Sequence, residues 1–173
     1  MQKQKYVRRG QRGLSLIEAS MVLALSAVVV AGAVMYYGTA AESAKVARAQ
    51  AQLGAIQTAV AGLYGNQSSY VGLDAAALQT SGALPVSYFS GVGAMVNPWN
   101  EAVTVAPVIG NRNYAITFTD IPAAACKKIV TSDAGTGVVS VEVGGSTGVS
   151  QLTLADANTG CGTTTQTVVY TVR

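Results

Sequence analysis

Residues 14–37 read LSLIEASMVLALSAVVVAGAVMYY, and every one of them is apolar or small except Glu18. As an α-helix this stretch would be about 36 Å long at ~1.5 Å per residue, which is enough to cross the hydrocarbon core of a bilayer. A carboxylate at the centre of an inserted helix costs on the order of 3 kcal/mol, so its presence points to a function. The stretch predicts a long apolar helix near the N-terminus and makes Glu18 the first candidate functional residue.

The chain continues past the apolar run with the pattern of an amphipathic helix. Apolar residues recur at spacings of three and four and would therefore share one helical face. They are Val46, Ala49, Leu53, Ile56, Val60 and Leu63. Gln52 falls largely off that face, and no proline occurs between residues 14 and 84. We expect one helix of roughly fifty residues from Leu14 to Tyr64, with Gly65 as its C-terminal stop.

Beyond Gly65 the composition shifts to Gly, Ser, Asn and Thr with short apolar runs. Period-two alternation predicts strands containing Val103/Val105, Tyr114/Ile116/Phe118, Val139/Val141/Val143, Leu152/Leu154 and Val168/Tyr170/Val172. Short helices are expected in LDAAALQTSG after Asp74 and in IPAAACKKIV after Pro122, and NPWN at 97–100 predicts a turn. This order predicts an α+β fold, with the long N-terminal helix packed on a C-terminal antiparallel sheet.

Positive charge is concentrated at the start of the chain. The net charge is +3, from 11 basic and 8 acidic residues. The basic residues that precede Leu14 are Lys3, Lys5, Arg8, Arg9 and Arg12. From Leu14 onward acidic residues outnumber basic ones, so nothing there resembles a nucleic-acid-binding surface and no nucleic-acid partner is expected.

The composition also excludes several kinds of catalytic site. The chain has no histidine, which rules out Ser-His-Asp and Cys-His catalysis and His-ligated zinc. The acidic residues Asp120, Asp133, Glu142 and Asp156 are scattered and suggest solvated surface, and Trp99 in NPWN suggests a packed turn residue. We expect no enzymatic activity and no cofactor.

Two cysteines, Cys126 and Cys161, lie far apart in the sequence. In a chain with an export-type N-terminus, an even number of cysteines favours a disulfide formed in an oxidising compartment. A two-thiolate metal site is the alternative, and it lacks further ligands nearby in the sequence. The disulfide is the expectation we favour.

The N-terminus admits several interpretations. A secretory signal peptide could be cleaved after Ala33, because Ala31-Gly32-Ala33 fits the A-x-A pattern. A single-pass anchor would need only the apolar length and the basic flank. Arg8-Arg9 suggests twin-arginine export, although in a poor context. None of these explains Glu18 or the amphipathic helix that follows without a turn.

The segment GLSLIE at residues 13–18, followed by the long apolar run, resembles the N-terminus of a type IV pilin precursor. In that family a prepilin peptidase cuts after the glycine and methylates the new N-terminus. The resemblance implies cleavage between Gly13 and Leu14, N-methylation of Leu14 and retention of the apolar run. It also implies that Glu18 pairs with the amine of Leu14, from its own chain or a neighbour, so that both buried charges are neutralised and the filament register is specified.

Other features resemble the type IVb subfamily. Leucine occupies the first mature position, and the leader is longer than is usual in type IVa pilins. The pair Cys126 and Cys161 is similar to the disulfide-closed C-terminal region of that subfamily. The segment NYAITFTDIPAAACKKIV at residues 113–130 is similar to the one that leads into the first such cysteine in type IVb pilins, including major pilins of thin conjugative or adhesive pili.

The resemblance implies four parts: a basic leader at 1–13, an apolar transmembrane and filament-core helix at 14–37, its amphipathic continuation at 38–65, and a globular pilin head at 66–173. We expect a major pilin that is held in the bacterial inner membrane and then polymerised through its N-terminal helices by an assembly machinery. The product would be an extracellular pilus for adhesion or conjugative contact. The alternatives are a type II secretion pseudopilin and a membrane-anchored periplasmic binding domain.

Overall fold

The structure, a computed structural model, describes residues 15–108 and 110–173. The chain divides into two compact parts, Met1–Ala40 and Ala41–Arg173, and we call the second part the head. The expected leader at residues 1–13, together with Leu14, lies outside the described residues.

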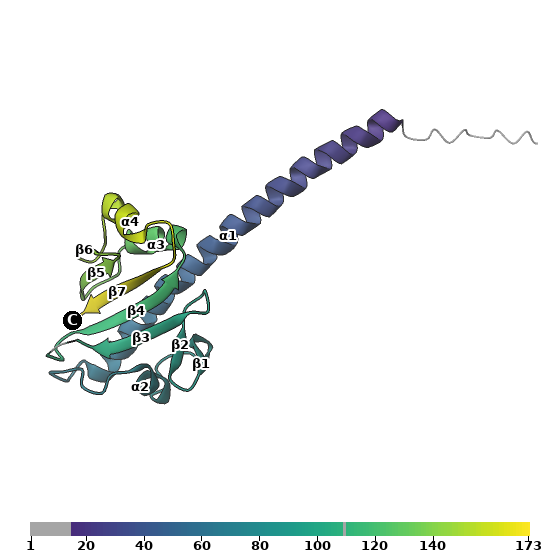
Figure 1. The fold of residues 1–173 in the computed structure, drawn as a ribbon. Helices are drawn as coiled ribbons and strands as arrows, with labels where there is room; N and C mark the ends of the chain where they lie inside the picture. Colours follow the sequence, from purple (N-terminus) through teal and green to yellow (C-terminus); the bar gives the residue numbers. More distant parts are fainter. Residues whose placement is uncertain (1–14, 109) are drawn as a thin grey trace, which may run out of the picture. The chain divides into compact units, whose positions relative to one another are not determined.

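The described secondary structure is one long helix followed by strands and short helices (Figure 1). In chain order the elements are α1 Leu16–Tyr64, α2 Ala75–Thr80, the 3-10 helix η1 Val86–Tyr88, β1 Phe89–Gly91, β2 Ala94–Val96, β3 Ala102–Pro107, β4 Tyr114–Ile121, α3 Ala123–Val130, β5 Val138–Val143, β6 Ser146–Gly148, α4 Leu154–Cys161 and β7 Gln166–Val172.

Helix α1 is continuous over 49 residues, as the sequence predicts. It passes through Gly32 and Gly38 without a break and ends at Tyr64, after which the Gly65 N–H donates to the Ala61 carbonyl at 2.9 Å. The predicted apolar face is confirmed except at Leu63, whose side chain is 38% exposed.

Gln52 corrects the predicted face of this helix, because it is buried and only 1% exposed. Its Nε2 donates to the Val96 carbonyl oxygen at 2.8 Å. A buried amide is tolerated when it is hydrogen-bonded, and strand β2 supplies the acceptor here. Helical spacing alone cannot reveal such a distant partner.

The head contains one sheet of seven strands in the order β1-β2-β3-β4-β7-β5-β6, and every neighbouring pair is antiparallel. The C-terminal strand β7 lies between β4 and β5, near the centre of the sheet (Figure 1). Tyr170 of β7 is paired with Ile116 of β4 on one side and with Val141 of β5 on the other. The sheet is therefore completed only when the last residues of the chain are in place.

The core lies between this sheet and the second half of α1. Burial alternates along β3, β4 and β7, as period-two strands with one face on a core require. From α1 the core takes Val46, Ala49, Gln52, Leu53, Ile56, Ala59 and Val60. All buried residues of α1 belong to the head.

Two of the expected strands need correction. Leu152 and Leu154 form no strand, because Leu154 begins helix α4 and Thr153 caps it by accepting the Asp156 N–H at 3.2 Å. The strand expected around Val139, Val141 and Val143 is present as β5, with Val141 and Val143 buried, but a register shift between Val138 and Ser140 leaves Val138 buried and Val139 41% exposed. A local cap and a bulge thus override short alternating patterns.

The other local predictions are confirmed. Asp74 caps α2 by accepting the Ala77 N–H at 2.6 Å, and Pro122 is the N-cap residue of α3. The three-residue strands β1, β2 and β6 and helix α4 were not predicted from the sequence. These strands are too short to show a periodic pattern.

Candidate assembly helix

The start of α1 is a capping box that contains Glu18. The Ser15 N–H donates to Glu18 Oε2, and the Glu18 N–H donates to Ser15 Oγ, both at 3.2 Å. The Ser15 carbonyl accepts the Ala19 N–H at 3.0 Å, so Ser15 is the N-cap residue. Glu18 therefore lies in the first turn of α1 and not near the centre of an apolar helix.

This arrangement places the carboxylate at the beginning of the helix. An acidic side chain is favourable there because the free N–H groups of the first turn carry partial positive charge. Glu18 Oε2 lies against the nitrogen of Ser15, the residue that follows Leu14 in the chain. Ser15 was not among the predicted site residues, although the S-x-x-E spacing that it forms with Glu18 is typical of a capping box.

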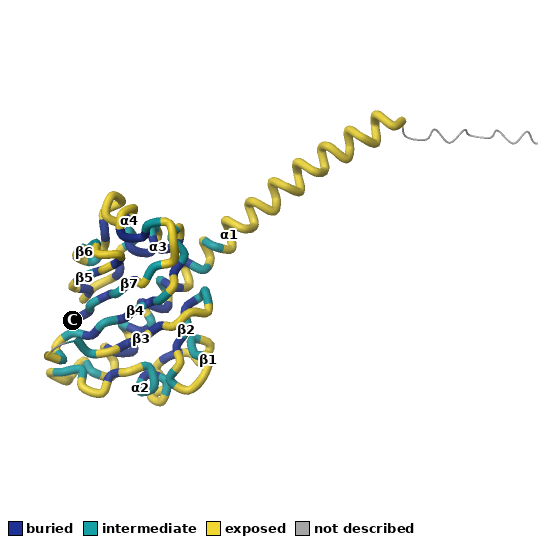
Figure 2. Tube along the Cα trace, in the orientation of Figure 1, coloured by how far each residue is buried: buried dark blue, intermediate teal, exposed yellow. Residues whose placement is uncertain are grey.

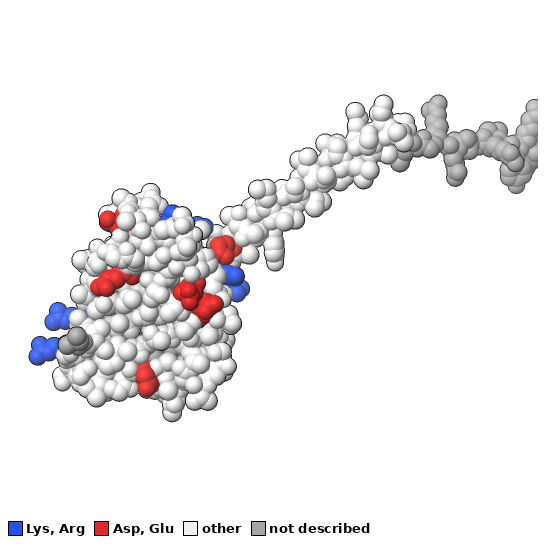
Figure 3. All heavy atoms as spheres, viewed as in Figure 1, with Lys and Arg blue, Asp and Glu red and all other residues white. Residues whose placement is uncertain are grey.

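The first half of α1 is exposed along its whole described length (Figure 2). Its large apolar side chains are mostly more than 60% exposed, from Leu16 at 91% to Tyr37 at 76%. On the face visible in Figure 3 it shows no charged side chain before the head. The helix is long and apolar enough to cross a membrane. An apolar surface of this size needs a lipid or protein partner.

The second half of α1 is fixed to the rest of the head by polar contacts as well as by the core. Trp99 Nε1 donates to Glu42 Oε1 at 2.8 Å, and Gln57 Nε2 donates to the Ala134 carbonyl at 3.0 Å. Gln50 Nε2 donates to Ser132 Oγ at 2.7 Å. Trp99 is thus a packed turn residue, as predicted, and it holds the second half of α1 against the rest of the head.

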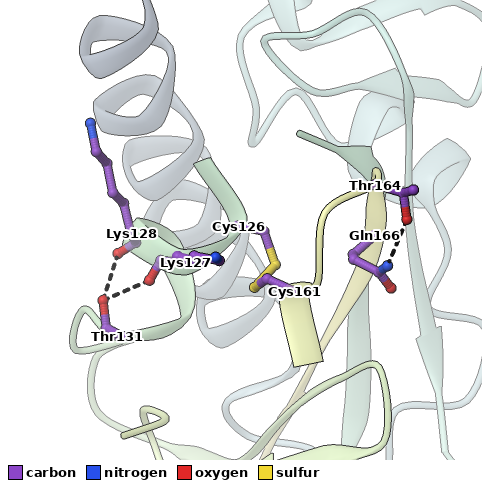
Figure 4. Close-up of a disulfide and its surroundings, with 7 residues drawn as sticks. All are labelled: Cys126, Lys127, Lys128, Thr131, Cys161, Thr164 and Gln166. Carbon is purple, nitrogen blue, oxygen red and sulfur yellow. Dashed lines mark hydrogen bonds between the residues drawn. A yellow bond between two sulfur atoms is a disulfide. The ribbon is translucent and has the colours of Figure 1, made fainter. Parts of the chain in front are cut away.

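The cysteines expected to pair are joined by a disulfide between Cys126 in α3 and Cys161 at the end of α4 (Figure 4). Both residues are fully buried. The two cysteines are 35 positions apart in the sequence, and their Cα atoms lie 5.8 Å apart. Thr131 Oγ1 donates to the Lys127 carbonyl at 2.7 Å and closes the last turn of α3.

The backbone is also closely packed in the region of the disulfide. A Cβ atom at Gly160 in α4 would clash with the Val143 carbonyl oxygen at the end of β5. Glycine is therefore required where α4 crosses the β5–β6 turn.

Among the described residues no group of three or more His, Cys, Asp or Glu side chains could hold a metal ion.

Two family models match the chain. The model described as Bundlin matches residues 38–171, which is most of the chain and nearly all of the head. The chain belongs to the bundlin family. The second model, the prokaryotic N-terminal methylation motif, matches residues 8–34 and so covers the GLSLIE segment and most of the apolar run.

Two curated relatives agree with this assignment. The chain is 37% identical over 132 residues to the "Major structural subunit of bundle-forming pilus" of Escherichia coli O127:H6, covering 75% of this chain and 68% of that protein. It is 29% identical over 180 residues to "Toxin coregulated pilin" of Vibrio cholerae, covering 92% of this chain and 80% of that protein.

A solved structure shares the fold. The type IV b pilin from Salmonella typhi matches with a TM-score of 0.56 and 21% identity, covering 70% of this chain and 95% of that one. The chain is a type IVb pilin with an N-methylation leader, because it belongs to the bundlin family, contains the N-terminal methylation motif and matches curated pilins. It is a structural, non-enzymatic subunit that self-polymerises into a surface pilus after processing by prepilin peptidase. This assignment replaces the pseudopilin and binding-domain alternatives.

Proposed function

We propose that prepilin peptidase cleaves this pilin between Gly13 and Leu14, methylates Leu14 and leaves the processed chain in the inner membrane. The assembly machinery then adds subunits to the fibre through α1. In the fibre, Glu18 is the charge partner of the Leu14 amine. One observation carries this proposal. After a single carboxylate in its first turn, the first half of α1 is exposed and uncharged.

The physical reason is the cost of burying charge. Cleavage would create an ammonium group at Leu14, one residue from the Ser15 nitrogen that now donates to Glu18. Packing the apolar helices together would remove both charges from water. A buried pair is tolerated when its geometry is good, whereas removing one partner leaves an uncompensated charge that costs about 3–5 kcal/mol. Correct register would therefore be favoured over any shifted arrangement.

The relatives support a fibre-forming role in a bundle. The Escherichia coli relative is by name the major structural subunit of a bundle-forming pilus. We propose that this chain is likewise the major subunit of its pilus and that its pili associate laterally for adhesion. Conjugative contact is the alternative purpose, and a mating assay with a deletion strain separates the two.

The assembly role is tested by Glu18→Val and Glu18→Gln, with Glu42→Gln as the matched control on the same helix. Both Glu18 variants should be cleaved and remain in the membrane, yet their yield in sheared pili should fall at least about 100-fold, as a buried unpaired ammonium requires. Glu42→Gln removes a charge from the same helix but keeps an amide oxygen that can accept the Trp99 Nε1–H, so it should assemble normally.

Intact mass of the mature subunit tests processing in the same samples. A mature chain that begins with methylated Leu14 supports the proposal, whereas one that begins at Val34 supports signal-peptide cleavage after Ala33. Normal pilus yield from cleaved Glu18→Val would show that Glu18 is not the assembly partner.

A further inference from the structure

The central strands of the head carry acidic residues at one end. Glu101 lies just before β3, and Asp120 is the last residue but one of β4. Because β3 and β4 are antiparallel, the start of β3 and the end of β4 lie together. Both carboxylate side chains are exposed. We call Glu101 and Asp120 the acidic end of the sheet.

The same sheet carries basic residues at its opposite end. Arg112 lies two positions before β4, and Arg173 directly follows β7. The register pairs Tyr114 with Val172, so the two arginines lie at the same end of adjacent strands. Both side chains are exposed. We call this pair the basic end, and the 8 residues of β4 separate it from the acidic end by about 26 Å at ~3.3 Å per residue.

The line from the acidic end to the basic end follows the second half of α1 (Figure 1). Close to the acidic end, Trp99 Nε1 donates to Glu42 Oε1 at 2.8 Å. Close to the basic end, the ring centroid of Tyr70 lies 5.7 Å from that of Tyr64 and 4.8 Å from that of Tyr114. The two ends of the sheet are therefore also the two ends of the head along α1.

The backbone is fixed by hydrogen bonds at both ends. The Asn97 N–H donates to the Glu101 carbonyl at 2.8 Å, and Asn97 Oδ1 accepts the Glu101 N–H at 3.1 Å. At the other end the Arg173 N–H donates to the Gly137 carbonyl at 2.9 Å. Only the side chains then lose freedom when they meet a partner, which lowers the entropic cost of binding.

A fibre brings the two kinds of end together. Subunits added through α1 all point the same way, so each head turns its basic end toward the acidic end of the next. A contact between different surfaces of identical subunits repeats without closing and builds a filament. We propose that the basic end of one head contacts the acidic end of the next head along the fibre, with Arg112 facing Glu101 and Arg173 facing Asp120. The inference rests on the proposed addition of subunits through α1.

The order of the strands defines how two such heads align. Strand β4 lies between β3 and β7. The acidic residues belong to the ends of β3 and β4, whereas the basic residues belong to the ends of β4 and β7. Both ion pairs form together only when one sheet is offset sideways from the next by one strand, which is about 4.8 Å. The contact therefore specifies the alignment of each head on its neighbour.

Basic side chains near the acidic end oppose other alignments. Lys45 and Arg48 follow Glu42 on α1, and Lys128 Nζ on α3 donates to Ser43 Oγ at 3.4 Å. A head displaced from the sheet toward α1 would bring its arginines against these like charges, which is unfavourable. Charged groups at an interface contribute more to specificity than to affinity. We therefore expect this contact to set the register of the heads.

Charge reversal tests the contact in assembled pili. Arg112→Glu and Glu101→Arg each place like charges across the contact and should lower the yield of sheared pili roughly 10-fold. The double variant Arg112→Glu/Glu101→Arg restores opposite charges and should recover to within about threefold of the parent, as coupled residues do. Glu142→Arg reverses an exposed charge within β5, away from both ends, and should assemble like the parent.

The amount and intact mass of the subunit in the membrane are measured in the same samples. Single variants that are cleaved and held in the membrane, yet are not recovered by the double variant, would overturn the contact. That result would leave the role of Glu18 standing, because the Glu18 variants test it separately. Normal pilus yield from both single variants would also overturn the contact.

Cross-linking tests which residues meet. Pili of Glu101→Cys/Arg112→Cys treated with a short bismaleimide should give a ladder of multimers on a denaturing gel, and the native cysteines are buried in their disulfide. Each single cysteine variant should stay monomeric, because the contact joins different residues, and the two single variants expressed together should give dimers only. A ladder from a single variant, or none from the assembled double variant, would overturn the proposal.

Discussion

At the residue scale, the described part of the head contains one buried side-chain polar atom that has no hydrogen-bond partner, the hydroxyl of Tyr170. The Tyr170 side chain is 1% exposed, and its ring packs edge-on against Phe118 with centroids 6.2 Å apart. Burial raises the pKa of this hydroxyl well above its ordinary value of 10.0. The folded chain therefore keeps a proton that the unfolded chain loses at high pH, and the stability of the head should fall as the pH rises above about 10.

Tyr170→Phe removes that hydroxyl and keeps the ring. The free energy of unfolding at neutral pH should stay the same or rise by about 1 kcal/mol, because a buried group without a partner carries a desolvation cost. Its decline above pH about 10 should become shallower. Urea denaturation at neutral and alkaline pH measures both effects, with the half-buried Tyr88→Phe as control. A loss of more than about 2 kcal/mol at neutral pH would mean that the hydroxyl has a partner in solution.

At the scale of elements, the disulfide ties α3 to α4, two short helices that strand pairing does not otherwise hold together. Closing a loop of this length lowers the entropy of the unfolded chain, which corresponds to about 4 kcal/mol of stability. The paired variant Cys126→Ala/Cys161→Ala should lose about that much in the free energy of unfolding. A reducing agent should destabilise the parent head by a similar amount and leave the variant unchanged. Equal stability of parent and variant would show that packing of α4 alone holds the region.

At the scale of the whole molecule, the core is built from residues of the head only, beginning at Val46. A chain of residues 41–173 should therefore fold with the same disulfide and unfold within a few degrees of the full-length protein. It should remain monomeric, because it lacks the exposed apolar half of α1. Circular dichroism and size-exclusion chromatography measure these properties. Loss of cooperative unfolding in the truncated chain would mean that the first half of α1 contributes to the stability of the head.

The sequence by itself determined the features that depend on residues close together in the chain. Helical spacing revealed α1, period-two alternation revealed β3, β4 and β7, and cap residues located α2 and α3. The GLSLIE segment and the apolar run placed the chain among type IV pilins, because cleavage, membrane insertion and helix packing all act on that continuous stretch. The pairing of Cys126 with Cys161 followed from there being only two cysteines.

Only the tertiary structure decided the features that depend on partners distant in the chain. Strand β7 lies between β4 and β5 because pairing is selected by burial of the whole sheet and not by order along the chain. Gln52 is buried because Val96 in β2 offers an acceptor, and Gly160 is needed because the β5–β6 turn approaches α4. The same holds for Trp99 and Glu42, which lie 57 positions apart and meet through one hydrogen bond. A local pattern records which side chains a segment carries, whereas burial and hydrogen bonding depend on what the rest of the chain brings against it.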